Sequence, residues 1–237
     1  RFNVKLNEGD KVYHVITQSY EVDGESGVVN PIGIRGQLLS ADYRLIIGPE
    51  LYEQNIQAAV KMAGYEMVRC MVNPLAAAES VISDDEKEAG VAVVDLGAGT
   101  SSLAVYSDNA MCYSSIIPFG GNLITNDIKE GCSILARQAE SLKVQFGQAL
   151  GETAESNKII TIPGINGWEP KEISVKTLAY IIQARMEEIL ESIAYQIQIS
   201  GLAESLNAGI VLTGGGAKLA RLAPLVRYKT GIQTRIG

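Results

Sequence analysis

The sequence predicts an α/β fold, with a buried sheet and covering helices that follow a small α+β module. Three observations support this prediction. Four apolar residues in a row, Val91 to Val94, are typical of a strand that is covered on both faces. Apolar residues recur at the i, i+3, i+4 spacing between 174 and 200, which predicts a long amphipathic helix. Two glycine-rich segments, which begin at Asp95 and Thr213, each lie at the end of a predicted strand.

Length and composition exclude several classes of protein. The chain has 237 residues, of which 46% are hydrophobic and 20% charged, as in ordinary globular proteins. A net charge of −7 without a basic run argues against a nucleic-acid partner. Its apolar stretches are far shorter than the roughly 20 residues of a membrane-spanning helix. His14 is the only histidine and the three cysteines form no C-x-x-C pair, which argues against a zinc site or a histidine triad.

The first 72 residues mix strands with one helix. The expected elements are a strand over 11–21, a loop over 23–33, a strand over 37–47, a helix over 49–64 and a strand over 65–72. Pro49 is tolerated in the first turn of a helix, and Gly64 is a typical residue at a helix end. These elements predict a small α+β module.

Residues 73–88 connect this module to the rest of the chain. Pro74 is expected to open a short helix. The acidic run from Ser83 to Glu88 interrupts the apolar pattern, and we expect it to be a loop. The main boundary of the chain is therefore placed here.

Residues 89–237 alternate strands and helices. Strands are predicted at 91–95, 102–107, 111–117, 158–162, 208–213 and 232–236. Helices are predicted at 122–131, 134–146, 174–200 and 218–227. Ser174 is a suitable N-cap for the longest helix, which would be about 40 Å long at 1.5 Å per residue.

The first glycine-rich segment reads DLGAGTSS and begins with Asp95. Gly97 and Gly99 allow the backbone to turn sharply and to bring its N–H groups close to an anion. Thr100 and Ser101 add hydroxyl donors, and Asp95 is placed to hold Mg²⁺ through water. Taken alone, the segment favours the ordinary interpretation, a hairpin whose turn contains glycine.

The second glycine-rich segment reads TGGGA and contains Gly214, Gly215 and Gly216. Three glycines allow the backbone to approach a flat ligand, and the start of the predicted helix that follows offers free N–H groups. Taken alone, this segment is equally compatible with an ordinary turn between a strand and a helix.

Together the two segments resemble the actin/Hsp70/sugar-kinase superfamily, and within it the FtsA family of bacterial cell-division proteins. The resemblance covers the whole chain. It rests on the runs NPIG at 30–33, VVDLGAGT at 93–100, IPFGGN at 117–122, AESLK at 139–143 and AGIVLTGGG at 208–216. It implies an actin-like (ribonuclease-H-like) ATPase half with an inserted helical subdomain, preceded by the small α+β module.

The resemblance also implies how the chain is divided. Residues 1–72 match the family's inserted subdomain 1C, which contacts neighbouring subunits in a polymer. Residues 89–121 and 207–237 match one ribonuclease-H-like half, and residues 122–206 match the helical subdomain inserted in it. The chain begins with Arg1 and lacks the family's first phosphate loop. We therefore expect a piece of a longer protein, without the N-terminal subdomain and without the C-terminal amphipathic membrane helix.

The resemblance implies ATP and Mg²⁺ as ligands. Gly97, Gly99 and Thr100 match the loop that holds the β- and γ-phosphates, with Ser101 beside them, and Asp95 matches the acid on the metal side. The remaining matches are a turn near the ribose (Gly120, Gly121, Asn122), a helix pair beside ribose and adenine (Glu140, Lys143), the adenosine floor (Gly214, Gly215, Gly216) and a lysine against the adenine (Lys218).

Two departures from the family's pattern bear on activity. Ala98 stands where a third glycine is common, and Asn73 stands where related ATPases place a Gln or Glu that orients the attacking water. We assign no catalytic residue and expect at most a weak ATPase. Without the opposing half of the site, the chain alone is expected to bind ATP weakly. Glu140 and Lys143, at the i, i+3 spacing, are also compatible with an ordinary surface ion pair.

The function implied by the resemblance is scaffolding in bacterial cell division. Such proteins bind nucleotide, associate with copies of themselves and tether FtsZ filaments to the inner membrane. We therefore expect a place on the cytoplasmic face of that membrane at the division septum. Two alternatives stay open: a pilus-assembly scaffold like PilM, and an actin-fold enzyme such as a kinase or a chaperone-type ATPase.

Arg185 is the candidate residue for partner binding. It lies among apolar residues of the longest predicted helix, where a side chain that covers the core and reaches water with its head is the ordinary interpretation. The resemblance adds that an Arg at the matching position lies in the subdomain that receives the C-terminal tail of FtsZ. A guanidinium group can bind a carboxylate of such a tail in bidentate fashion.

Overall fold

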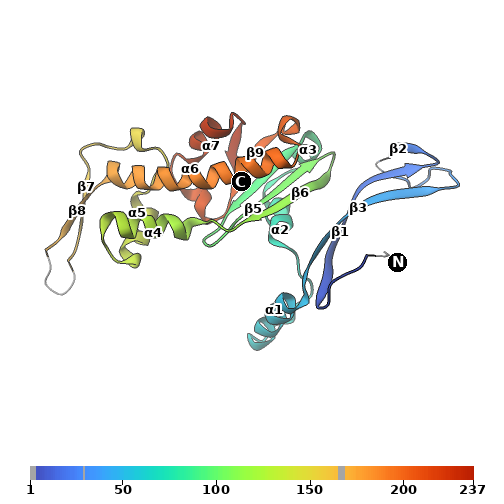
Figure 1. Ribbon diagram of the computed structural model, residues 1–237, viewed down its shortest axis with the longest axis horizontal. Coiled ribbons are helices and arrows are strands. Elements are labelled where there is room, and N and C mark those ends of the chain that lie inside the picture. Colours follow the sequence, from blue (N-terminus) through green and yellow to red (C-terminus); the bar gives the residue numbers. More distant parts are fainter. Residues whose placement is uncertain (1–3, 29, 165–168) are drawn as a thin grey trace.

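The computed structural model describes the chain except for residues 1–3, 29 and 165–168, so these parts of the predicted segments 1–72 and 122–206 lie outside the described residues. Figure 1 shows two parts side by side. The N-terminal module (residues up to 72) is a long hairpin with one projecting helix. The sheet unit (residues 73 onward) contains a five-stranded sheet and the helices around it.

The five-stranded sheet has the order β10-β9-β4-β5-β6. Its strands are β4 (Val91–Leu96), β5 (Ser101–Ser107), β6 (Ala110–Ile117), β9 (Gly209–Thr213) and β10 (Thr234–Ile236). The first three form an antiparallel meander, whose tight turn places Asp108 and Asn109 at positive φ. β9 runs parallel to β4, with Asp95 opposite Thr213. The carboxyl ends of β4 and β9 therefore meet at one edge of the sheet.

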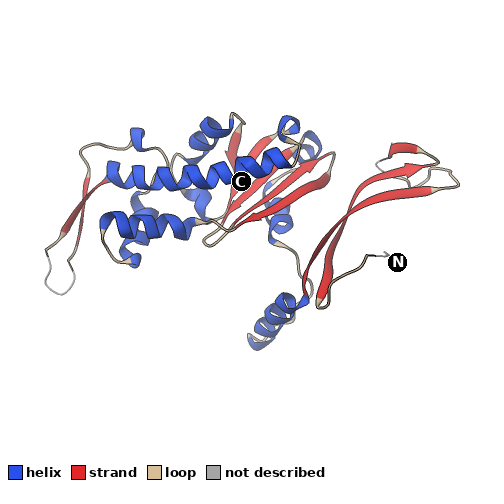
Figure 2. Ribbon diagram, viewed as in Figure 1, coloured by secondary structure: helices blue, strands red, loops and turns tan. Residues whose placement is uncertain are grey.

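Helices cover both faces of this sheet. Alternate residues of β4 and β5, such as Val94 and Leu103, point into a cluster with the long helix α6 (Val175–Ile199) and with α7 (Leu222–Thr230). The intervening residues, such as Val93, pack with α2 (Asn73–Val81) on the other face. This two-sided burial confirms the prediction made from the apolar run at the start of β4. Figure 2 shows α6 crossing the sheet.

A helical segment is inserted between β6 and β9. It comprises α4 (Gly121–Cys132), α5 (Ala136–Phe146), a short hairpin of β7 (Ile159–Ile162) and β8 (Lys171–Ser174), and α6. Buried residues of α4 and α5, including Ile128 and Leu142, pack against Ile182 of α6. The strand β8 was not predicted. Ser174 does precede the first residue of α6, but its side chain makes no capping hydrogen bond.

The N-terminal module is built from β1 (Asp10–Val22), β2 (Glu25–Val28), β3 (Leu39–Pro49) and α1 (Glu50–Met62). The strands β1 and β3 form the long antiparallel hairpin, and β2 pairs with the end of β1 inside the segment that was predicted to be a loop. Val22 is the only apolar side chain in the described part of these four elements that is buried. The module therefore has almost no core of its own.

The strand predicted over 65–72 is wrong. The segment is not part of any strand of the structure, and Val68 is 94% exposed. Its apolar and β-branched residues favour an extended chain, but a strand also requires a partner for its backbone hydrogen bonds. The end of this segment is bonded to β1, where the N–H of Val72 donates to Nε2 of His14 over 3.1 Å.

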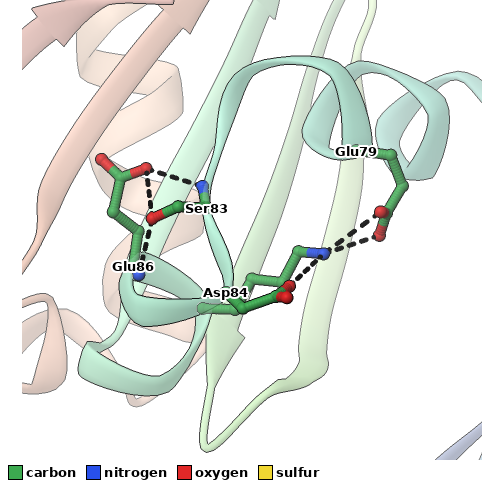
Figure 3. Close-up of polar contacts among 5 residues, drawn as sticks. Glu79, Ser83, Asp84 and Glu86 are labelled. Carbon is green, nitrogen blue, oxygen red and sulfur yellow. Dashed lines mark hydrogen bonds and ion pairs between the residues drawn. The ribbon is translucent and has the colours of Figure 1, made fainter.

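The acidic run, predicted to be a loop, is the helix α3 (Asp84–Ala89). Figure 3 shows the reason, which is a capping box: the N–H of Glu86 donates to Oγ of Ser83, and the N–H of Ser83 donates to the carboxylate of Glu86. Three acidic side chains in the first turn also favour the positive end of the helix dipole. Lys87 joins this helix to α2 through an ion pair with Glu79, at 3.1 Å.

The other predicted elements are present, with ends that differ by a few residues. The largest shift concerns the helix predicted over 218–227. A four-residue 3₁₀ turn, Gly215–Lys218, follows β9, and α7 begins only at Leu222. No helix in the described part of the chain is both long and apolar enough to cross a membrane.

Candidate functional site

Three glycine-containing turns meet at the carboxyl edge of the sheet. The first turn, residues 97–100, joins β4 to β5, the second, residues 118–120, joins β6 to α4, and the third, residues 214–216, follows β9. The parallel pairing of β4 with β9 brings the first and third turns together. Segments far apart in the sequence thus form one site.

Backbone hydrogen bonds hold the first two turns together. The N–H of Gly121 donates to the carbonyl of Gly97 over 2.9 Å, and the N–H of Asn122 donates to the carbonyl of Ala98 over 2.8 Å. Within the first turn, the N–H of Gly97 donates to the carbonyl of Thr100. These bonds leave the N–H groups of Ala98 and Gly99 without an acceptor in the described chain.

A cavity of about 290 Å³ lies between these turns and the helices α4, α5 and α6. Many of the predicted ligand-binding residues line it, namely Gly97, Ser101, Gly120, Gly121, Asn122, Glu140, Lys143, Gly215, Gly216 and Lys218. Four others, Asp95, Gly99, Thr100 and Gly214, do not line it but belong to the first and third turns or precede them. The site brings together a set that the sequence scatters over more than a hundred positions.

The apolar part of the cavity wall was not predicted. It is formed by Leu96, Ile124, Val144, Met186, Ile189 and Leu219. Met186 and Ile189 belong to the apolar stripe of α6, where the pattern indicates core residues and does not distinguish a cavity wall. Only the packing of α6 against the turns places Met186 and Ile189 at the cavity.

The fold requires glycine at some positions of the site and not at others. A Cβ atom on Gly120 would lie 2.6 Å from the carbonyl oxygen of Ala98, and one on Gly214 would lie 2.1 Å from Oδ1 of Asp95. Close packing of the fold therefore requires glycine at these two positions. A Cβ atom on Gly99 or Gly215 would meet nothing within 4 Å, and neither residue has positive φ. The fold alone does not require glycine there.

Glu140 and Lys143 lie on one face of α5 and form an ion pair of 2.7 Å. The ammonium group of Lys143 also donates to the carbonyl of Gly121 over 2.9 Å and to the hydroxyl of Thr125 over 2.7 Å. The Thr125 hydroxyl in turn donates to the Glu140 carboxylate. Thr125 was not predicted, because no sequence motif marks it.

These contacts set the charge of Glu140. Partial burial raises its pKa, but the hydrogen bonds from Lys143 and Thr125 lower the pKa by more, so that it lies below the ordinary value for a glutamate. Oε1 of Glu140 has no hydrogen-bond partner in the described chain. The site therefore presents an ionised, partly satisfied acceptor beside the cavity.

Ser101 and Asp95 are both engaged by the fold. The side chain of Ser101 is buried, and its hydroxyl donates to the carbonyl of Phe119 over 2.7 Å, which holds the second turn against the first. The carboxylate of Asp95 accepts a hydrogen bond of 2.6 Å from the side-chain amide of Asn73. No group of three or more His, Cys, Asp or Glu side chains in the described residues is arranged to hold a metal ion by itself.

Arg185 lies on α6, next in sequence to Met186 of the cavity wall, and its guanidinium group is already paired. Its Nε and Nη2 atoms donate to the two carboxylate oxygens of Asp127, at 2.5 and 3.1 Å, and Nη1 donates to Glu188 at 2.6 Å. The side chain is 30% exposed and lines a second hollow together with Phe119, Leu123 and Tyr195.

The fold and the turns define an actin-like protein. The structure of MreB5 from Spiroplasma citri bound to AMPPNP matches with a TM-score of 0.69 and 22% identity, over 80% of this chain and 60% of MreB5. The PilM–PilN type IV pilus biogenesis complex matches with a TM-score of 0.65 and 16% identity, over 94% of this chain and 56% of the solved chain. These matches confirm the predicted fold class.

Sequence comparisons identify the family. The model described as "Cell division protein FtsA" matches residues 92–237, and the model described as "SHS2 domain inserted in FTSA" matches residues 2–47. The chain belongs to the FtsA family. It is 34% identical to cell division protein FtsA of Neisseria meningitidis serogroup B and of Escherichia coli K12, over 99% of its own length in each case. The chain spans 57–58% of the length of these relatives.

Proposed function

We propose that the cavity binds the adenosine end of ATP. The observation that carries this proposal is that three glycine-containing turns and the Glu140–Lys143 pair surround one cavity in a chain of the FtsA family. Structures of MreB5 with the same fold were solved with AMPPNP and with ADP, which adds support.

The residues present fit such a ligand. Apolar side chains on one side of the cavity, such as Ile124 and Met186, suit a purine ring, and open space beside Gly215 allows the ring to lie against the backbone. Oε1 of Glu140 is free to accept from a ribose hydroxyl. The free N–H groups of Ala98 and Gly99 suit phosphate oxygens.

Asp95 is the residue we propose for the metal side of the site. Its carboxylate stands at the end of β4 beside both glycine-rich turns, and oxygen ligands are the kind that Mg²⁺ prefers. A bound Mg²⁺ would neutralise charge on the phosphates, with Asp95 holding it through water. A single carboxylate is consistent with a metal that is bound mainly by the nucleotide.

At the level of the whole protein, we propose an ATP-dependent scaffold of bacterial cell division. It would associate with copies of itself and tether FtsZ filaments to the inner membrane, on the cytoplasmic face at the septum. Membership of the FtsA family supports this proposal. We assign no catalytic residue, because the side-chain amide of Asn73 already donates to Asp95 and Ser102, and a weak ATPase is the most we expect.

Arg185 remains our proposed contact for the FtsZ tail, in a modified form. A tail carboxylate would have to share or displace the contact that Asp127 makes with the guanidinium group. The hollow beside it, with exposed Tyr195 and Phe119, offers apolar surface for the rest of a short peptide. The change Arg185→Glu would place a third carboxylate beside Asp127 and Glu188. Arg185→Gln removes the positive charge without adding this repulsion and is therefore the better test.

A scaffold that serves a pilus, as in the PilM–PilN complex, is the main alternative, because that structure matches 94% of the chain. Fluorescence anisotropy of the full-length protein with a labelled FtsZ C-terminal peptide and with a PilN-derived peptide tests the proposal. We expect saturable binding of the FtsZ peptide and none of the PilN peptide. The reverse preference would contradict the proposal, and fast phosphate release with a small acceptor would indicate an enzyme.

A further inference from the structure

Asn73 lies where the N-terminal module joins the sheet unit and is the first residue of α2. Its side-chain nitrogen donates to Oδ2 of Asp95 over 2.6 Å and to Oγ of Ser102 over 2.9 Å. Asp95 and Ser102 are paired neighbours on β4 and β5, so one amide group bonds across both strands. Both hydrogens of the amide are used, which fixes its orientation.

Helix capping does not explain this arrangement. An Asn at the start of a helix usually caps it by accepting a bond from a backbone N–H. Here the N-cap position is Val72, no side chain caps the helix, and the Asn73 amide donates away from α2 toward the sheet. The bond therefore serves Asp95 more directly than it serves the helix.

The bond also determines how Asp95 presents its second oxygen. Oδ2 is held by Asn73, while Oδ1 is directed at the third turn, 2.1 Å from the point where a Cβ on Gly214 would stand. Oδ1 has no hydrogen-bond donor in the described part of the chain. The carboxylate is thus oriented with one oxygen bound and one oxygen free beside both glycine-rich turns.

We propose that Asn73 is a positioning residue, which holds the Asp95 carboxylate in the orientation that Mg²⁺ bound to a nucleotide requires. The proposal rests on the nucleotide binding proposed above. Partners that orient a metal-binding side chain typically contribute about 10–100-fold to metal affinity. Because Asp95 would act through water, we expect the lower end of that range.

The test compares ATP affinities of the full-length protein by calorimetry, with Mg²⁺ and with EDTA. The variants are Asn73→Ala, the similarly sized Asn73→Leu, and a control, Asn207→Ala. Asn207 donates its amide to the carbonyl of Ala89, before the start of β4 and thus at the opposite end of that strand from Asp95. We expect Mg²⁺ to tighten binding by the wild type and by the control. Both Asn73 variants should lose about tenfold of this gain, with affinity in EDTA within about twofold of the wild type.

The outcomes separate this proposal from the one before it. No ATP binding by the wild type would overturn the proposed function and this proposal together. Binding by the wild type with an unchanged gain from Mg²⁺ in both Asn73 variants would overturn this proposal alone. Unfolding of both variants, seen as a lost thermal transition, would show that the Asn73 contact is structural and would also overturn it.

Discussion

The N-terminal module and the sheet unit contain equally regular strands but bury very different amounts of apolar surface. In β4 and β5 nearly every side chain is buried, whereas in the 13-residue strand β1 only Val22 is. Both regions show apolar residues in strand-like patterns in the sequence. Such a pattern therefore predicts the extended backbone, whereas burial of the side chains depends on whether another element covers that face of the strand.

A hydrogen bond and a set of apolar contacts join the two regions. Gln18 donates its side-chain amide to the carbonyl of Met111 at the edge of the five-stranded sheet. Ile16 and Ile46 pack against the cluster under α2. The module is therefore attached to the sheet unit through side chains of β1 and β3, while the proposed ligand site lies within the sheet unit.

The largest expected effect is the difference between a Val→Ala change in the sheet unit and the same change in the N-terminal module. Val105 is fully buried in β5, and Val15 is 45% exposed in β1. We expect Val105→Ala to lower the free energy of unfolding by about 2–3 kcal/mol, through lost burial and the cavity left behind. Val15→Ala should change it by less than about 0.5 kcal/mol. Urea denaturation followed by circular dichroism measures both, and equal losses would contradict the comparison.

The next effect concerns partner binding. We expect Arg185→Gln to weaken binding of an FtsZ tail peptide by about tenfold, equivalent to about 1.4 kcal/mol. Asp127→Asn should tighten it, because that change frees the guanidinium group from a competing carboxylate. Arg35→Gln, the same change on the exposed surface of the N-terminal module, is the control. Fluorescence anisotropy gives the three affinities.

A loss of affinity in Asp127→Asn equal to that in Arg185→Gln would show that the pair acts by holding α4 to α6. It would return Arg185 to a purely structural role. Equal affinities in all variants would leave the partner surface of the chain unidentified.

The smallest effect is a pH dependence inside the N-terminal module, at the segment that leads into the sheet unit. Burial, and then the charge of Arg69, lowers the pKa of His14 below the ordinary 6.5. The neutral imidazole accepts the bond from Val72, so its stabilisation is present above pH 6.5 and is lost as the pH falls below that value. Between pH 7 and 5 we expect amide exchange in residues 65–72 to rise, after correction for the intrinsic rate.

Three glutamates of the sheet unit, Glu86, Glu140 and Glu187, should contribute little to this change. Hydrogen bonds with Ser83, with Lys143 and with Lys229 accompany lowered pKa values of Glu86, Glu140 and Glu187, so that these groups stay ionised at pH 5. His14→Gln keeps an acceptor but cannot titrate, and it should remove the pH dependence. A rise of the same size in that variant would contradict the role assigned to His14.

Local patterns predicted most of the sheet unit. The strands β4 and β9 carry apolar runs and the helix α6 has a strong periodicity, and the glycine-rich segments lie at the ends of β4 and β9 as expected. The errors lie where tertiary context decides. The segment 65–72 has the composition of a strand but no pairing partner among the described residues, and the acidic run folds as a helix because of the Ser83–Glu86 capping box.

The candidate site was predictable only in part, for a related reason. The glycines could be found because they interrupt strand and helix patterns in a recognisable order. The contacts of Thr125 with Glu140 and of Asn73 with Asp95 join residues 15 and 22 positions apart. They depend on how α4 packs on α5 and on where α2 meets the sheet, and neither is encoded in a local pattern.

The cavity beside the third turn is where we propose that the adenosine end of ATP binds. Gly215 tests it most directly, because a Cβ there meets no protein atom within 4 Å while the residue lines the cavity. We expect Gly215→Val in the full-length protein to abolish ATP binding in calorimetry, with an unchanged circular-dichroism spectrum and melting temperature. Wild-type affinity for ATP in a folded Gly215→Val protein would contradict the claim.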